Sequence, residues 1–111
     1  MIMKTGIVII EDNLLLAEGY KKIINSSSHF HVMEIYNNCE SAIKNLKHDH
    51  PDIILMDIEL PKMNGVEGTK HIKSIYPKIE IIIVTVYENS STVFDALCAG
   101  ASGYLSKKRV I

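Results

Sequence analysis

Three short stretches of the chain are apolar at every position rather than at alternate positions. They are residues 7–10, 53–56 and 81–84, which read Ile-Val-Ile-Ile, Ile-Ile-Leu-Met and Ile-Ile-Ile-Val. Strands that are covered on both faces have this composition, because the side chains on both sides are then buried. The three stretches therefore predict strands in the interior of a parallel sheet.

Segments with helical spacing separate these strands. After the first strand, apolar residues recur three and four positions apart at Leu16, Tyr20, Ile23 and Ile24. Residues at this spacing lie on one side of a helix, so the segment predicts a helix with one apolar side facing the sheet. Asn13 precedes the segment and is a suitable cap for its first turn.

Three further helices are predicted from spacing and from the residues that end them. Two cover residues 40–47 and 66–76, and each is followed by a proline that cannot continue it. The last covers residues 90–100, with Asn89 or the serine after it as the cap and Gly100 at the end.

Two weaker strands complete the pattern. Residues 30–36 are β-branched and aromatic but more polar, which predicts a more exposed strand, and Tyr104 and Leu105 predict a short fifth strand. Strand and helix then alternate, so we predict an α/β doubly wound sheet with right-handed connections. No repeat or low-complexity linker interrupts residues 1–111, which are predicted to form one domain.

Composition and charge exclude several classes of function. With 111 residues, of which 47% are hydrophobic, the chain has enough apolar material for one core. A formal net charge of -1 without a basic surface argues against direct binding of nucleic acid. No segment resembles a secretion signal or a membrane span, so a cytoplasmic protein without membrane contact is expected. Cys39 and Cys98 have no paired spacing and are predicted to be small buried residues.

Reactive side chains follow the predicted strands at the ends that share one edge of a parallel sheet. Glu11 and Asp12 follow the first strand, Asp57 the third and Thr85 the fourth, and Lys107 comes shortly after the fifth. Ligands of open parallel sheets bind at this edge. A charged residue at a strand end often has no role beyond contact with solvent. The joint placement of acids, a hydroxyl and an amine nevertheless favours a functional site.

The carboxylates of Asp12 and Asp57 would repel each other at this edge, by about 4 kcal/mol at a separation of about 4 Å and an effective dielectric constant of about 20. A cation is therefore expected, and Mg²⁺ suits carboxylate and phosphate oxygens. Lys107 supplies a second positive charge, or neutralises the acids without a metal. Beside such cations a carboxylate can act as a nucleophile toward a phosphoryl group, with Thr85 as a hydrogen-bond donor.

Residues 57–65 fit an active-site loop. Pro61 stiffens it, and Gly65 is able to take a backbone conformation that other residues avoid. A simple tight turn would use the same residue types.

The order of these residues resembles one family over nearly the whole chain. The matching stretches are Glu11-Asp12, residues 53–65, Thr85 and residues 99–107. Together they resemble the receiver domain of two-component response regulators, most closely that of NarL/LuxR-type transcriptional regulators. The resemblance implies a flavodoxin-like sheet of five parallel strands in the order 2-1-3-4-5. Receivers usually continue into a fifth helix and often into an output domain; here that helix is expected to be missing or truncated, and no output domain is expected.

The resemblance also implies roles for individual residues. Asp57 is the phosphoacceptor, and Thr85 and Lys107 contact the phosphoryl group. The groups that hold Mg²⁺ all offer oxygen atoms: Glu11, Asp12, Asp57 and the backbone carbonyl of Glu59.

Signalling residues are implied in the same way. Tyr104 corresponds to the switch aromatic, which turns inward when the threonine hydroxyl moves to meet the phosphate. Glu59 and Tyr87 lie two positions after Asp57 and Thr85, where the family tunes the lifetime of the acyl phosphate. The implied partners are a sensor histidine kinase and an output domain or downstream protein, with a homodimer as a further option.

Alternatives fit parts of the pattern. A degenerate receiver would be an unphosphorylated interaction module, although all reactive positions are filled. A phosphohydrolase with an aspartyl nucleophile needs an acid two positions on, where Glu59 is one methylene longer than the usual Asp. A flavin- or nucleotide-binding module needs a phosphate cradle where Glu11 and Asp12 stand. We expect no enzymatic activity beyond the domain's own phosphotransfer and dephosphorylation.

Overall fold

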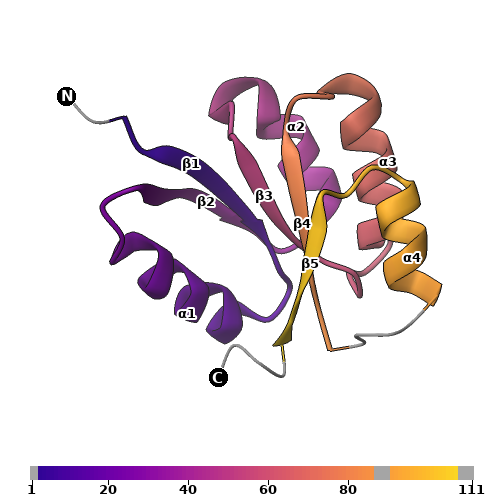
Figure 1. The fold of residues 1–111 in the computed structure, drawn as a ribbon, viewed down its shortest axis with the longest axis horizontal. Coiled ribbons are helices and arrows are strands. Elements are labelled where there is room, and N and C mark those ends of the chain that lie inside the picture. The colour runs from indigo at the N-terminus through magenta and orange to yellow at the C-terminus, as the bar shows by residue number, and fades with distance from the viewer. Residues whose placement is uncertain (1–2, 87–90, 108–111) are drawn as a thin grey trace.

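The computed structural model describes residues 3–86 and 91–107 of the chain. Five strands in these ranges form one sheet in which all neighbours are parallel, in the order β2-β1-β3-β4-β5 (Figure 1). The strands are β1 (Thr5–Ile10), β2 (Phe30–Tyr36), β3 (Ile53–Asp57), β4 (Glu80–Thr85) and β5 (Gly103–Ser106). The predicted doubly wound architecture and strand order are confirmed.

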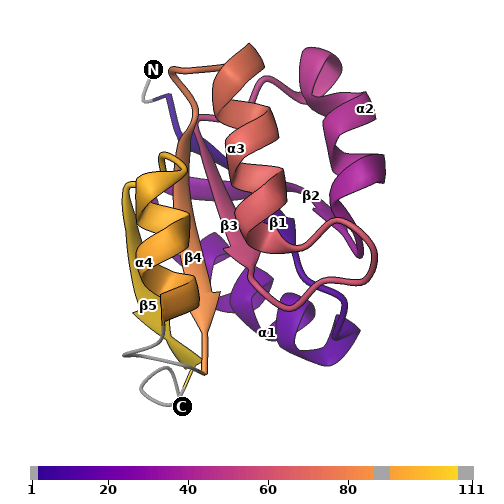
Figure 2. The same ribbon diagram turned by 90° about the vertical axis from the view of Figure 1, so that its right-hand side faces the viewer.

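Four helices connect these strands within the described residues: α1 (Leu14–Asn25), α2 (Cys39–Asp49), α3 (Gly65–Ile75) and α4 (Ser91–Cys98). α1 lies on one face of the sheet, and the other three helices cover the opposite face (Figure 2). No helix follows β5 as far as residue 107, where the description of the C-terminal part ends, and the caps predicted at residues 89 and 90 also lie outside the described ranges. None of the described helices has the length and apolar character needed to cross a lipid bilayer.

An asparagine directly precedes each of the first three helices. The side chain of Asn13 accepts a hydrogen bond from the Leu16 N–H at 3.2 Å, and Asn38 caps α2 in the same way. Asn64 caps α3 reciprocally with Glu67, since each side chain accepts from the backbone N–H of the other. These caps satisfy N–H groups that a helix leaves unpaired, and they fix where each helix begins after its strand or loop.

Alternate residues of the central strands face opposite sides of the sheet, and both sides carry apolar residues. The larger core cluster lies under α2, α3 and α4. Its strand residues are Val8, Ile10, Ile54, Met56, Ile81 and Ile83, all fully buried. On the other face the buried cluster consists of Ile7, Ile9 and Ala17, with partly buried neighbours around it.

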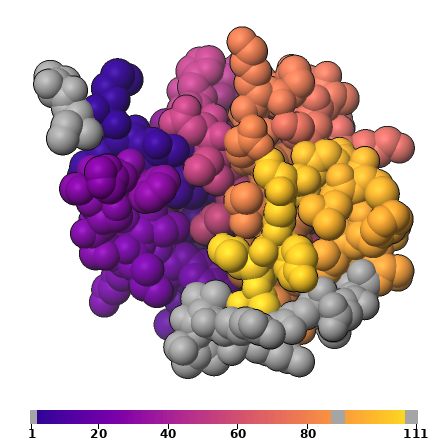
Figure 3. Space-filling model, in the orientation of Figure 1, coloured from indigo at the N-terminus to yellow at the C-terminus, as the bar shows by residue number. Residues whose placement is uncertain are grey.

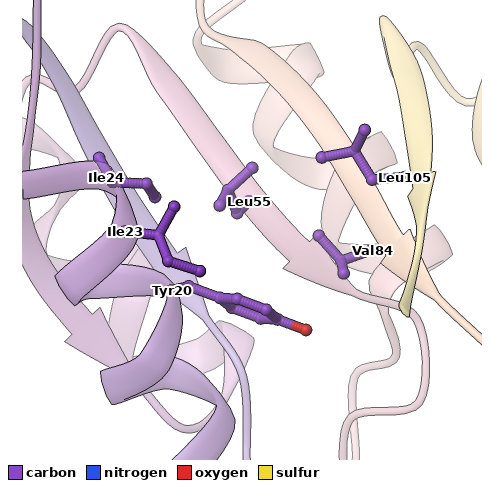
Figure 4. Close-up of a pocket in the computed structure, with 6 residues that line it drawn as sticks. All are labelled: Tyr20, Ile23, Ile24, Leu55, Val84 and Leu105. Atoms are coloured by element: carbon purple, nitrogen blue, oxygen red, sulfur yellow. The ribbon is translucent and has the colours of Figure 1, made fainter. Parts of the chain in front are cut away.

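An apolar groove opens between α1 and the strands on the α1 face. Figure 3 shows a hollow between α1 and β5, and Figure 4 shows the residues that line the groove. They are Tyr20, Ile23, Ile24, Leu55, Val84 and Leu105. Ile23 is 61% exposed, so the apolar side of α1 that the spacing predicts is only partly covered.

The two cysteines differ in environment. Cys39 is buried, with its Sγ 3.6 Å from the Met56 Sδ, and burial raises the pKa of its thiol from 9.0 to about 12. Cys98 is exposed, so the prediction of a second buried thiol is wrong. The reason is its position on α4, because Val93 and Ala96 lie on the buried side of this helix and Cys98 does not.

Candidate functional site

Three acids predicted from the strand ends meet at one edge of the sheet. Glu11 and Asp12 follow β1, and Asp57 is the last residue of β3. Each offers a carboxylate oxygen to a group in which all of these oxygens lie within 4.8 Å of one another. Glu11 and Asp57 are buried, whereas Asp12 is exposed. Over the described ranges no other group of three acidic, histidine or cysteine side chains comes as close together.

Lys107 brings a positive charge to the two buried acids. Its Nζ lies 2.9 Å from the Glu11 Oε1 and 3.3 Å from the Asp57 Oδ1. The predicted meeting of residues from the ends of β1, β3 and β5 is therefore present. Among the described residues Glu11 and Asp57 share this ammonium group, and the Asp12 carboxylate lies close to both acids, so negative charge is in excess at the site.

Burial and the neighbouring charges act in opposite directions on the Glu11–Lys107 pair. Burial raises the pKa of the Glu11 carboxyl, and repulsion by Asp57 adds to the rise, although Lys107 and the N–H of Asn13 (3.1 Å) oppose it. Burial alone would lower the pKa of Lys107, but its bond to Glu11 and its attraction to Asp57 outweigh this effect and raise it. Lys107 is thus held in its charged form, and a further cation would favour the ionised form of Glu11.

The segment after β3 contributes Glu59 to the site. The Asp57 Oδ1 accepts a long hydrogen bond from the Glu59 N–H at 3.4 Å. The N–H of Gly65 donates to the Ile58 carbonyl at 2.8 Å, which closes residues 58–65 into a compact loop.

Gly65 is required for close packing and not for an unusual backbone conformation. A Cβ at this position would overlap the Asp57 carbonyl oxygen and lie 2.7 Å from the Ile58 Cα. The loop's positive φ, 60°, belongs to Lys62. The prediction made for Gly65 was therefore right about the residue type but wrong about its physical reason.

A surface cavity surrounds the acids at this edge. Its lining residues are Glu11, Asp12, Asn13, Leu16, Asp57, Glu59, Val86 and Lys107. Sequence reasoning did not assign Leu16 and Val86 to the site, because an apolar side chain beside a charged cavity carries no chemical signal. Their nearness to the ends of β1 and β4 was the only available indication.

Thr85 and Tyr104 lie on the next two strands of the sheet, β4 and β5. Thr85 ends β4 and is 2% exposed, and β4 pairs with β3 so that Asp57 is opposite Val84. Tyr104 pairs with Ile83 and is 41% exposed, so its ring lies at the surface. Tyr87, predicted to tune phosphoryl lifetime, is outside the described residues.

The family assignment is supported by sequence as well as by geometry. The profile of the family described as "Response regulator receiver domain" matches residues 7–110, which is nearly the whole chain. The chain belongs to this family.

Relatives and solved structures agree with the receiver assignment. The receiver is 39% identical over 105 residues to the transcriptional regulatory protein DegU of Brevibacillus brevis, a match that covers 95% of this chain and 44% of that protein. It is 38% identical over 101 residues to the transcriptional regulatory protein LnrK of Bacillus subtilis (strain 168), covering 91% and 46%. The chain thus spans about half the length of these curated relatives.

A solved structure extends the agreement to three dimensions. The two-component response regulator of the LuxR family from Aurantimonas sp. SI85-9A1 superposes with a TM-score of 0.89 at 30% identity, covering 95% of this receiver and 75% of that chain. The predicted likeness to LuxR-type regulators is confirmed.

The donor set of the receiver fits a hard divalent cation. Carboxylate oxygens from Glu11, Asp12 and Asp57 converge, and they carry more negative charge than Lys107 neutralises. Mg²⁺ prefers such oxygen ligands. The acidic cluster can therefore hold a metal ion.

Proposed function

We propose that this receiver accepts a phosphoryl group on Asp57 and works as a phosphorylation-controlled signalling switch. The observation that carries the proposal is the convergence of the three carboxylates and Lys107 in one surface cavity. The groups that would hold Mg²⁺ are Glu11, Asp12, Asp57 and the backbone carbonyl of Glu59. When bound, the ion offsets negative charge on the transferring oxygens.

The arrangement around Asp57 suits nucleophilic attack on phosphorus. Its Oδ1 faces two donors, the Lys107 ammonium and the Glu59 N–H, so we assign the attack to Oδ2. An oxygen–phosphorus bond forms, the bond between phosphorus and the donor atom breaks, and its electron pair leaves with the donor. Lys107 then pairs with an oxygen of the bound phosphoryl group, because its Nζ is already 3.3 Å from the same side chain.

Phosphorylation adds about two negative charges and three acceptor oxygens at the end of β3. We infer that the Thr85 hydroxyl, at the end of the neighbouring strand β4, moves to donate to one of these oxygens. Tyr104 is partly exposed in this structure and would turn inward in response. The two-state element is then α4 with β5, and Glu59 and Tyr87 would tune how long the acyl phosphate survives.

The partners follow from the reaction and from the relatives. We propose that a sensor histidine kinase donates the phosphoryl group and that an output domain or a downstream protein responds to the phosphorylated domain. Since DegU and LnrK are named transcriptional regulators, transcription is the proposed output. Residues 1–111 would form the receiver domain, acting in the cytoplasm. We propose that these residues bind neither nucleic acid nor membranes and have no enzymatic activity beyond their own phosphotransfer and dephosphorylation. Homodimer formation stays a prediction.

Beryllofluoride, which mimics a bound phosphoryl group, tests the switch together with Mg²⁺. We expect saturable changes in the amide NMR signals of Thr85, Tyr104 and Lys107. Asp57→Asn should keep the fold, because the change is nearly isosteric, and should show no such changes. An unresponsive wild-type spectrum would instead indicate a degenerate receiver.

A further inference from the structure

The loop that follows Asp57 is held by a side chain from a different helix. The backbone N–H of Met63 donates to the Glu40 Oε2 at 3.3 Å, and the two residues are 23 positions apart. Glu40 lies in the first turn of α2. Its other oxygen, Oε1, is buried and has no hydrogen-bond partner in the structure. Burial of one oxygen without a partner is unfavourable, so the bond from Met63 to the other oxygen matters for the carboxylate as well as for the loop.

The start of α2 also packs closely against the end of this loop. The Cys39 Sγ lies 3.8 Å from the Asn64 carbonyl oxygen. A Cβ at Gly68, in the first turns of α3, would lie only 2.5 Å from the same sulfur atom. The Glu40 contact is therefore part of a close junction between α2 and the segment that carries Glu59.

The loop needs outside contacts to keep its conformation. Lys62, directly before Met63, has a φ of 60°, which is unfavourable for a residue with a side chain. Strained backbone persists only where its surroundings fix it. The Met63 side chain packs against the core under α2, α3 and α4, and the Glu40 carboxylate fixes the backbone of the same residue.

We propose that Glu40 is a positioning residue for the phosphoacceptor site. Its bond to Met63 holds residues 58–64 in the conformation in which Glu59 lines the cavity beside Asp57. Glu40 acts through the loop and touches neither the ion nor the phosphoryl group. This proposal rests on the proposed function, because it assumes that the Glu59 carbonyl and Asp57 hold Mg²⁺.

A purely structural role would have different consequences. An acid in the first turn stabilises any helix by interacting with its unpaired N–H groups. Loss of that effect alone would lower stability without changing the loop or the cation site. Loss of a tether would also change hydrogen exchange at Met63 in metal-free protein and the affinity for Mg²⁺.

Three substitutions at Glu40 separate these roles. Glu40→Ala removes the acceptor, and we expect faster exchange of the Met63 amide and about tenfold weaker Mg²⁺ binding, the equivalent of one hydrogen bond. Glu40→Gln keeps an acceptor oxygen at the same reach and should restore most of both properties without the charge. Glu40→Asp keeps the charge at the helix start but is one methylene shorter, so it should behave like Glu40→Ala.

The matched control lies at the opposite end of α2. Asp49→Ala also removes one carboxylate and one hydrogen bond, that from the Tyr36 hydroxyl at 2.5 Å. We expect this variant to be destabilised but to bind Mg²⁺ as the wild type does. Mg²⁺ titrations followed by NMR, amide exchange and urea unfolding provide the three readouts.

The outcomes distinguish this proposal from the proposed function. If the wild type binds Mg²⁺ and both Glu40→Ala and Glu40→Asp match it in affinity and Met63 exchange, the tether is refuted. If Glu40→Ala does not fold, Glu40→Asp decides by the same measurements. A wild-type protein that binds no Mg²⁺ contradicts the proposed function itself, while faster Met63 exchange in the variants would still establish the tether.

Discussion

The two faces of the sheet are built from the same strands but are covered differently. Under α2, α3 and α4, Ile54 and Ile83 are completely buried. On the α1 face, the next residues along the same strands, Leu55 and Val84, line an open groove, and Leu105 is 49% exposed beside them (Figure 4). The strands are thus apolar on both faces, but the described helices cover only one of these faces fully.

The largest difference between the two faces is expected in how much free energy of unfolding is lost when a core residue on each face is replaced by alanine. Ile54→Ala should lower the free energy of unfolding by about 3–4 kcal/mol, because it leaves a cavity in a fully packed cluster. Leu55→Ala should cost about half as much, since its side chain is already partly exposed in the groove. Urea unfolding of both variants measures the difference. Equal losses would show that the α1 face is as tightly packed as the other.

Alanine substitutions at two helical glycines are expected to change stability in opposite directions. Gly68→Ala on α3 would place its Cβ 2.5 Å from the Cys39 Sγ and 3.2 Å from the Met56 Cε, and it should destabilise by about 1–3 kcal/mol. Gly19→Ala on α1 meets nothing within 4 Å and should stabilise by about 0.5–1 kcal/mol through helix propensity. Thermal unfolding would show the two shifts. A stabilising Gly68→Ala would mean that the α2–α3 contact is looser than described.

The rates at which the two cysteine thiols react with a reagent test the packing around each of them. Cys98 is exposed and should react rapidly with a thiol reagent at pH 8. Cys39 is buried with a pKa of about 12, so its thiolate fraction is about a thousandfold lower than at a pKa of 9.0. Mass spectrometry during labelling should therefore show one fast adduct, which Cys98→Ser removes. A second fast adduct would indicate frequent opening under α2.

Much of the fold follows from local patterns. Unbroken apolar runs identified β1, β3 and β4, because burial on both faces leaves little room for polar residues. The acids at the strand ends pointed to the site, since parallel strands place their carboxyl ends at one edge. Glu11, Asp57 and Lys107 meet there as predicted.

Other features depend on contacts between distant segments, which spacing along the chain does not reveal. Ile23 belongs to the apolar side of α1 but is 61% exposed beside the open groove. Gly65 is required because α3 begins against the backbone of Asp57. The Glu40 contact joins α2 to a loop 23 positions away and has no local sequence signature.

The most direct test is to locate the phosphoryl group after reaction with acetyl phosphate. We expect Mg²⁺-dependent addition of one phosphoryl group, found by mass spectrometry on the peptide that contains Asp57 and absent from Asp57→Asn. A label on another residue, or equal labelling of the variant, would contradict the assignment of Asp57 as the acceptor.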